Sequence, residues 1–288
     1  MIALSNGRMI NNVVASGGLA YDGKGWFWER PLVAAGLIKP EMFTVVTKTL
    51  TRYKRAGNFR WYKPRESVRL ISGGAVNKIG LSNPGIVHWN RFFVPRIDFS
   101  RQIVVSIYGE REELIEMTTE VLNDLDLTAI ELNLSCPNLA GGLVEEVEKV
   151  VDDVKSVRDV SLHPVIAKLS VAQDYLSIAE KIAGEAEAIS LNSVPWEMVF
   201  PRQRSPLFSL QSRVGGGGGG VSGKPAQEYN WAAVESLAIQ GCLPVIAPSV
   251  MDEEDLVAVR DLGASAISFG VIHLFNPRGP TKMMVKMS

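Results

Sequence analysis

The sequence predicts a closed (β/α)8 barrel, a TIM barrel, and three observations support this prediction. Short apolar runs rich in β-branched residues alternate with amphipathic segments along most of the chain, which is typical of βαβ units and a parallel sheet. The length of 288 residues fits one barrel, so we expect a single domain over residues 1–288. Polar residues also end several of the runs, and barrel enzymes gather their reactive groups at those strand ends.

The elements follow from the same pattern. Strands are predicted at 44–47, 103–107, 129–134, 165–169, 187–191, 244–247 and 265–269, with a weaker eighth near 68–72. Helices are predicted at 111–126, 143–158, 175–186, 229–240 and 253–262. The competing fold is a doubly wound open sheet, but no GxGxxG turn opens the chain, which favours the barrel.

Two long irregular segments interrupt the alternation, at 49–100 and 193–228. Loops of this length in a compact domain are usually functional or mobile. The second contains six consecutive glycines, Gly215 to Gly220. Such a run could let the backbone approach a phosphate, or it could be a flexible hinge. The following VSGK is not a P-loop, because Pro225 stands after Lys224.

Bulk composition excludes several classes of function. The formal net charge of −1 offers no electrostatic argument for binding nucleic acid or a membrane surface. The two cysteines cannot form a disulfide framework, the N-terminus lacks the apolar core of a signal peptide, and no apolar run approaches the ~18 residues of a membrane helix. We therefore expect a reduced, cytoplasmic protein.

No metal site is expected. The sequence has no HExxH, no paired CxxC and no cluster of carboxylates. Its three histidines, His88, His163 and His273, stand in unrelated contexts and are interpreted as structural or surface residues.

The segment AIELNLSCPN at 129–138 is the most informative of the strand ends. Its apolar run ends in Asn133, Ser135, Cys136 and Asn138. Buried cysteines are most often inert, so Cys136 is either a packed thiol or a general base or nucleophile. The surrounding amides, and the position after a barrel strand, favour a reactive thiol.

Two lysines also lie at or near strand ends, Lys48 after TVVT and Lys168 in VIAKLS. An unpaired buried ammonium is costly, so each lysine either extends to solvent at the rim or meets an electron-rich ligand. A flavin fits, because its reduced ring carries negative charge near N1 and O2. Asn77, Asn133, Asn138 and Asn192 are individually simple turn residues, but together they suit a pyrimidine-like ring.

These motifs resemble, in the same order, those of the dihydroorotate dehydrogenase family. NLSCPN at 133–138 is the most specific, and the resemblance covers nearly the whole chain. The supporting motifs are ASG at 15–17, VTKTLT at 46–51, GN at 57–58, NKIGLSNPG at 77–85, AKLS at 167–170, LNS at 191–193, GGVSG at 219–223 and GASAISFG at 263–270. Cysteine, rather than serine, at position 136 resembles the soluble class 1 enzymes.

The resemblance implies FMN at the carboxyl end of the barrel and oxidation of dihydroorotate to orotate in pyrimidine synthesis. Cys136 would take a proton from C5, and a hydride would pass from C6 to N5 of FMN. The implied substrate-binding residues are Lys48, Asn77, Gly80, Leu81, Asn133, Asn138, Asn192 and Ser193. The implied cofactor-binding residues are Ser16, Gly17, Lys48, Thr49, Asn133, Lys168, Gly223, Ser249 and Gly270.

The chain departs from the family pattern at the turns expected to hold the FMN phosphate. Pro248 and Ser249 stand where the family has Gly-Gly, and proline has no N–H to donate. Val271 stands where the family usually has threonine, which removes a hydroxyl. Phosphate contacts would then come from Ser249 or from the turn at Gly270.

Other aspects of the activity stay open on the sequence. The electron acceptor could be fumarate, a quinone, or NAD reached through an iron–sulfur/FAD partner subunit, because the chain has no cysteine cluster of its own. Class 1 relatives imply a homodimer. The alternatives to dihydroorotate oxidation are a flavin enzyme acting on another dihydropyrimidine and a non-catalytic barrel that binds a pyrimidine or nucleotide.

Overall fold

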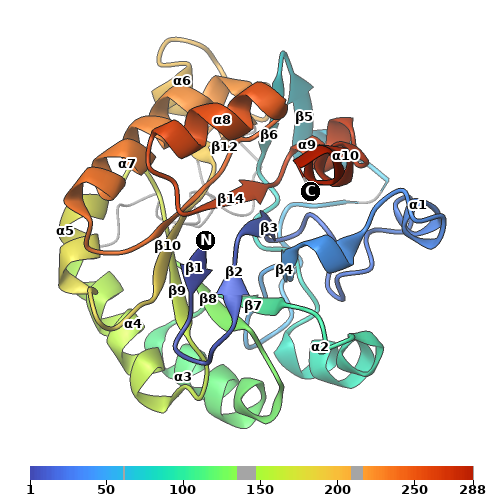
Figure 1. Ribbon diagram of the computed structural model, residues 1–288. Helices are drawn as coiled ribbons and strands as arrows, with labels where there is room; N and C mark the ends of the chain where they lie inside the picture. The colour runs from blue at the N-terminus through green and yellow to red at the C-terminus, as the bar shows by residue number, and fades with distance from the viewer. Residues whose placement is uncertain (61, 135–146, 209–216, 288) are drawn as a thin grey trace.

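Eight parallel strands close into a barrel, which confirms the predicted (β/α)8 architecture (Figure 1). The computed structural model describes residues 1–60, 62–134, 147–208 and 217–287. In chain order, the barrel strands are β3 (Asn12–Val14), β4 (Thr44–Val46), β7 (Ile103–Ile107), β8 (Ala129–Asn133), β9 (Val165–Leu169), β10 (Ala188–Leu191), β13 (Val245–Ala247) and β14 (Ala266–Phe269). Each pairs in parallel with its neighbours, and β14 pairs with β3 to complete the ring.

Helices surround this ring (Figure 1). They are α1 (Arg30–Ala34), α2 (Ile86–Phe92), α3 (Arg111–Glu120), α4 (Val147–Val160), α5 (Tyr175–Lys181), α6 (Trp196–Val199), α7 (Gln227–Gln240), α8 (Glu253–Asp261), α9 (Ile272–Phe275) and α10 (Gly279–Met287). Outward-facing strand residues such as Ile130 and Ile189 pack with helix residues such as Val154 and Leu237 in one apolar layer. Burial of these side chains attaches the helices to the barrel.

The eighth strand is not where the sequence prediction put it. Residues 68–71 form β5 (Val68–Ile71), which pairs antiparallel with β6 (Gly74–Asn77) outside the barrel. The eighth barrel strand is β3, which precedes the ASG motif. The central residues of β5, Arg69 and Leu70, are exposed, and a strand inside a parallel barrel would have to bury them.

Two predicted helices also end earlier than expected. The first stops at Glu120 and is followed by a 3-10 turn at Leu122–Asp124, and the third stops at Lys181. The second continues to Val160, and its predicted first residues, 143–146, lie outside the described residues.

The interior of the barrel is apolar at its floor and polar above it. Val104, Ala129, Ile166 and Ala188 pack in the floor layer, and an N-terminal hairpin covers the barrel there (Figure 1). This hairpin consists of β1 (Ile2–Ala3) and β2 (Met9–Ile10). Successive side chains of a strand alternate between its two faces. The next inward positions along these four strands are therefore Ser106, Glu131, Lys168 and Ser190, all of them buried.

A second sheet lies at the carboxyl end of the barrel. Its strands run in the order β11 (Val194–Pro195), β12 (Gly220–Gly223), β6 and β5, all antiparallel. β11 begins three residues after the end of β10, and β5 and β6 lie in the long connection after β4. Strands from the two long irregular segments, which the sequence indicated as functional or mobile, therefore share one sheet beside the strand ends that carry the polar residues.

Lys78, directly after β6, is buried in this region, with only 3% of its surface exposed. Its ammonium has no hydrogen-bond partner among the described residues. Burial lowers the pKa of Lys78 from its ordinary value of 10.5, and the carboxylate of Glu197 opposes part of that shift. A buried cation with so little compensation destabilises the folded chain.

Replacing Lys78 with methionine is expected to stabilise the protein by about 1–3 kcal/mol at neutral pH. Between the lowered pKa of folded Lys78 and 10.5, the unfolded chain holds a proton that the folded chain lacks. The free energy of unfolding of the wild type therefore rises with pH through that interval. The difference in unfolding free energy between Lys78→Met and wild type should shrink over the same interval. Urea denaturation at pH 7 to 10 measures both effects. The exposed Lys155, changed to methionine, is the control, and a destabilised Lys78→Met protein would refute the interpretation.

Candidate active site at the barrel mouth

An ion pair lies inside the barrel, just below its carboxyl end. The Lys168 ammonium on β9 is 3.3 Å from Glu131 Oε1 on β8. Ser190 on β10 donates a hydrogen bond of 3.1 Å to Glu131 Oε2. The register places Lys168 beside Asn133 on one side and Ser190 on the other. Three adjacent strands thus contribute one polar group each to this layer.

A chain of hydroxyl groups continues the polar layer around the other side of the barrel. Ser16 Oγ donates to the carbonyl oxygen of Thr47 at 2.9 Å and lies 3.0 Å from Thr49 Oγ1. Thr49 Oγ1 is in turn 3.0 Å from Ser106 Oγ and accepts a hydrogen bond of 3.2 Å from Asn133 Nδ2. Ser106 on β7, Asn133 on β8, Ser16 after β3 and Thr49 after β4 are therefore linked by direct hydrogen bonds.

Lys48 is held beside this chain by its backbone. Its N–H donates to the carbonyl oxygen of Ala20 at 2.9 Å. A Cβ atom added at Gly17 would lie 3.8 Å from Lys48 Cγ, so the predicted ASG turn passes next to the lysine stem. The indole of Trp26 donates to the Gly17 carbonyl oxygen at 2.8 Å, which fixes that turn from outside.

The GLSNPG segment forms a tight turn with two consecutive residues at positive φ, Gly80 at +68° and Leu81 at +55°. A β-carbon at Gly57 would lie 2.5 Å from the Ile79 carbonyl oxygen, so only glycine fits against this turn. Asn83 secures the end of the turn, because its side chain donates to the Leu81 carbonyl oxygen and accepts from Gly85 N–H. Successive N–H groups in such turns form concavities that bind anions.

Asn77, Asn192 and Ser193 lie on the elements that join the barrel to the second sheet. Asn77 ends β6, and its Nδ2 donates to the carbonyl oxygen of Gly220 at 3.3 Å. Asn192 N–H donates to Leu169 at the end of β9, and Asn192 Oδ1 accepts from Ser193 N–H at 2.8 Å. The loop after β10 therefore lies over the end of β9, close to Lys168.

The turn after β13 is clamped by α7. Ser249 has a φ of +68°, its carbonyl oxygen accepts from Gln227 Nε2, and its hydroxyl accepts from Asn230 Nδ2. The Pro248 carbonyl oxygen accepts from Trp231 Nε1 at 3.1 Å. Within the described ranges, no acceptor contacts the N–H groups of Ser249, Val250, Gly270 or Val271. Two adjacent strand ends therefore present backbone donors.

Gly223, at φ +94°, has a packing role of its own. An added Cβ would lie 2.6 Å from the Gly73 carbonyl oxygen and 3.3 Å from Val271 Cγ1. The next residue, Lys224, pairs with Asp252 at 2.6 Å and Asp255 at 2.7 Å. Its charge is thus engaged by α8, consistent with the sequence interpretation that VSGK is not a P-loop.

Some predictions cannot be placed. Cys136 and Asn138 lie outside the described residues, as do Gly215 and Gly216 of the glycine run. Both site residues follow soon after Leu134, whose N–H donates to the Lys168 carbonyl oxygen at 3.0 Å.

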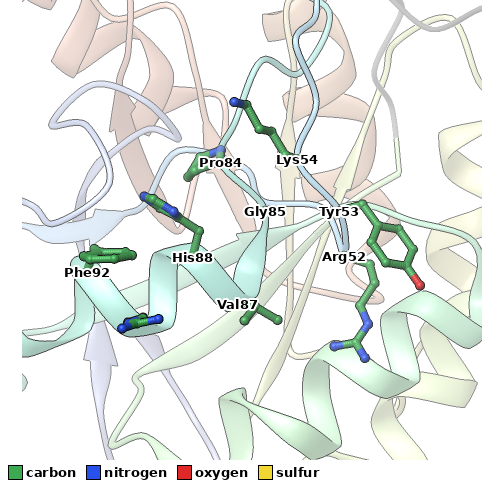
Figure 2. A pocket seen from close by; sticks show the side chains of 9 residues that line it. Arg52, Tyr53, Lys54, Pro84, Gly85, Val87, His88 and Phe92 are labelled. Atoms are coloured by element: carbon green, nitrogen blue, oxygen red, sulfur yellow. The ribbon is translucent and has the colours of Figure 1, made fainter.

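A cavity of about 430 Å³ lies elsewhere, between the loop after β4 and α2 (Figure 2). Its lining includes Lys54, His88 and Phe92 but none of the predicted site residues. Arg52 at its edge is bridged to Glu116 and Glu120. This cavity is therefore separate from the mouth.

Comparison with known proteins identifies the family. Residues 8–284 match the family described as dihydroorotate dehydrogenase. The chain belongs to the dihydroorotate dehydrogenase family. It is 33% identical over 250 residues to "Dihydroorotate dehydrogenase B (NAD(+)), catalytic subunit" of Caldicellulosiruptor saccharolyticus, covering 83% of this chain and 78% of the relative. The protein of the same name from Bacteroides fragilis is 32% identical over 245 residues, 81% of this chain and 76% of that relative.

A solved structure supports the fold. The ligand-free dihydroorotate dehydrogenase of Eimeria tenella aligns with a TM-score of 0.68 at 14% identity, over 96% of this chain and 84% of that one. The resemblance stated from the motifs, including the likeness to class 1 members, is confirmed, and the chain is an oxidoreductase of this family.

Dihydroorotate dehydrogenases use a flavin, and the residues at the mouth fit one. Lys168 and the hydroxyl and amide groups of Thr49 and Asn133 supply a cation and hydrogen-bonding groups for a ring with alternating carbonyl and N–H groups. The N–H groups after β13 and β14 are donors suited to a phosphate. Pro248, which lacks an N–H, does not remove these donors.

Sequence reasoning missed residues that shape this candidate site. Glu131 sits inside an apolar run, yet the alternation Ala129, Glu131, Asn133 could have marked it as inward-facing. His273 has the structural role that the sequence analysis allowed for it: it is buried, with Nδ1 3.1 Å from Glu29 Oε1. Glu29 also accepts from Trp26 N–H, so this pair supports the tryptophan that holds Gly17. No sequence motif indicates that contact.

Two further observations concern other classes of function. None of the helices in the described ranges has the length and apolar character that a membrane crossing needs. Those ranges also contain no group of three or more His, Cys, Asp or Glu side chains arranged to hold a metal ion.

Ser249 gives a test of the geometry at the β13 turn. Its positive φ strains any residue with a β-carbon, and a β-branched side chain is strained further. Ser249→Val should lower the free energy of unfolding by about 1–2 kcal/mol more than Ser249→Ala, which loses the same Asn230 hydrogen bond. Urea denaturation of the two variants measures the difference, and equal stabilities would show that residue 249 does not adopt this conformation.

Proposed function

We propose that this chain, as one FMN-binding barrel over residues 1–288, oxidises dihydroorotate to orotate in pyrimidine synthesis. The observation that carries the proposal is the polar layer at the mouth, built from four strand ends. Asn133, Thr49 and Ser16 are joined by hydrogen bonds, and Lys168, paired with Glu131, lies beside Asn133 in the strand register. Family membership indicates which reaction is catalysed. The polar layer provides charged and hydrogen-bonding groups that this reaction needs, at the carboxyl end of the barrel, where barrel enzymes have their active sites.

FMN, when bound, supplies the acceptor for the hydride that leaves C6 of the substrate. The protein's part in that step is orientation and charge. Lys168 would offer its positive charge to the ring, which becomes negative on reduction, and Asn133 and Thr49 would hydrogen-bond the ring. Ser16 and Gly17 would line it, with Lys48 beside them.

The substrate would be bound by amides and a cation. Asn77, Asn133, Asn138 and Asn192 match the alternating carbonyl and N–H groups of a dihydropyrimidine ring, and Ser193 continues that set. The turn at Gly80 and Leu81 would receive the carboxylate, because its positive φ angles form an anion-binding turn. Lys48 adds a positive charge to this site.

Cys136 would act as the general base. C5 of dihydroorotate is acidified by the neighbouring carbonyl group, and a base positioned at such a proton contributes about 10²–10⁴-fold to the rate. The proton would move from C5 to the thiolate, while Lys48 stabilises negative charge developing on the substrate.

The FMN phosphate would be held by Ser249, Gly270 and Gly223. The backbone donors after β13 and β14 support this assignment. Because the Ser249 hydroxyl already accepts from Asn230, it can still donate its own hydrogen to a phosphate oxygen.

A second subunit would remove the electrons. The relatives at 32–33% identity are named as catalytic subunits of an NAD(+)-linked enzyme, which implies that those proteins act with another chain. We propose that this chain likewise passes electrons to an iron–sulfur/FAD partner subunit. The homodimer implied by the class 1 resemblance stays a prediction.

The function is tested by anaerobic titration of the FMN-loaded protein. Dihydroorotate should bleach the flavin absorbance within seconds, whereas dihydrouracil, which lacks the carboxylate, should react at least about 10²-fold more slowly. Reoxidation by fumarate, a quinone and NAD, each added in turn, then identifies the acceptor. A protein that binds FMN but is reduced by neither dihydropyrimidine would be a binding barrel rather than an enzyme.

Replacing Cys136 with alanine should reduce turnover by about 10²–10⁴-fold while FMN affinity stays within twofold. Cys136→Ser should keep only slight activity at neutral pH, because a serine hydroxyl ionises far less than a thiol at that pH and so supplies very little of the proton-accepting anion. Stopped-flow reduction by dihydroorotate measures the rate, and the half-buried Cys242 changed to alanine is the matched control. Near-normal reduction of Cys136→Ala would contradict the assignment of the base.

A further inference from the structure

Glu131 is a buried carboxylate that neither the sequence motifs nor the proposed catalytic steps use. It projects into the barrel from β8, between the apolar floor and Asn133. Its side chain is 5% exposed, and that of its partner Lys168 is 10% exposed. Charged side chains are almost never so deeply buried unless they are paired.

The two oxygens of Glu131 have different partners. Oε1 is 3.3 Å from the Lys168 ammonium, and Oε2 accepts the Ser190 hydroxyl at 3.1 Å. Ser190, on β10, holds the Glu131 carboxylate in place. Glu131, on β8, in turn holds the Lys168 ammonium in place. With one backbone register tying β8, β9 and β10 together, the three groups have little freedom to separate.

We infer that Glu131 is the counter-ion of Lys168: it positions the ammonium and reduces the positive charge that the flavin ring experiences. This inference rests on the proposed function, since it takes Lys168 to face bound FMN. Glu131 is a positioning residue, because it acts on the cofactor through Lys168 and through its field.

The electrostatic consequence has a definite sign. Oxidised FMN has a neutral ring, and the fully reduced ring is an anion. A negative charge below the ring disfavours reduction, and a positive charge favours it. Inside a protein, where charges are weakly screened, a single buried charge near the ring changes the relative affinity for the two forms by an order of magnitude or more.

The test measures the midpoint potential of bound FMN by equilibration with a reference dye, which reports the ratio of affinities for reduced and oxidised FMN. Glu131→Gln keeps the shape and removes the charge, so this ratio should rise about tenfold over wild type. Lys168→Met should lower it by a similar factor. A role of Glu131 limited to stability would change the unfolding midpoint and leave the ratio unchanged.

Two controls separate charge from packing. Ser190→Ala removes the hydrogen bond to Glu131 without changing any charge, and its ratio should stay within about threefold of wild type. Asp153→Asn removes another buried carboxylate paired with a lysine, Lys149 at 3.1 Å, but on α4 outside the barrel. Its ratio should equal that of wild type.

The outcomes are distinct. Wild-type protein that takes up no FMN overturns the proposed function and this inference together. Wild type that binds FMN, with a ratio unchanged or lowered in Glu131→Gln, overturns the inference alone. If Glu131→Gln does not fold, the double variant Glu131→Gln/Lys168→Met is compared with Lys168→Met. The double variant should show a ratio at least about fivefold higher, and equal ratios would refute the counter-ion role.

Discussion

The site depends on one constraint, the two-residue alternation of side chains along strands that close into a parallel barrel. Every second side chain of each strand must point into the barrel. These side chains fill the interior in stacked layers, so the barrel is a packed core and not an open pore. Here the first layer is aliphatic, and the next contains Ser106, Glu131, Lys168 and Ser190. Burying a charge in that second layer requires a partner on a neighbouring strand. The Glu131–Lys168 pair meets this requirement and brings a cation to the barrel mouth.

The loops at the mouth hold conformations that most residues avoid. The three non-glycine residues at positive φ in the described ranges are Ala20, Leu81 and Ser249, and each lies in a loop beside the site. Ala20 receives the Lys48 N–H, Leu81 is held by Asn83, and Ser249 is clamped by α7. Such strain persists only where surrounding contacts determine the backbone, and it is concentrated at functional sites. The mouth is therefore built by the loops as much as by the strands.

The sequence could predict the barrel because long apolar strands and their polar ends are local signals. It failed at β3, where three residues beginning with Asn12 close the ring, since so short a strand has no detectable period. It could place Lys48, Lys168 and Asn133 at strand ends from chain order alone. It could not predict that Lys168 pairs with Glu131 or that Trp231 and Asn230 hold the turn after β13. Those contacts join residues that only the closed fold brings together.

The central claim is that the polar layer at the barrel mouth binds a flavin with the pyrimidine above it. The most direct measurement is a crystal structure of the protein grown with FMN and orotate. The account predicts the isoalloxazine ring at the carboxyl end of the barrel, with the Lys168 ammonium and Asn133 within hydrogen-bonding distance of it. A ring bound elsewhere, such as in the cavity beside α2, with the mouth empty, would contradict the account.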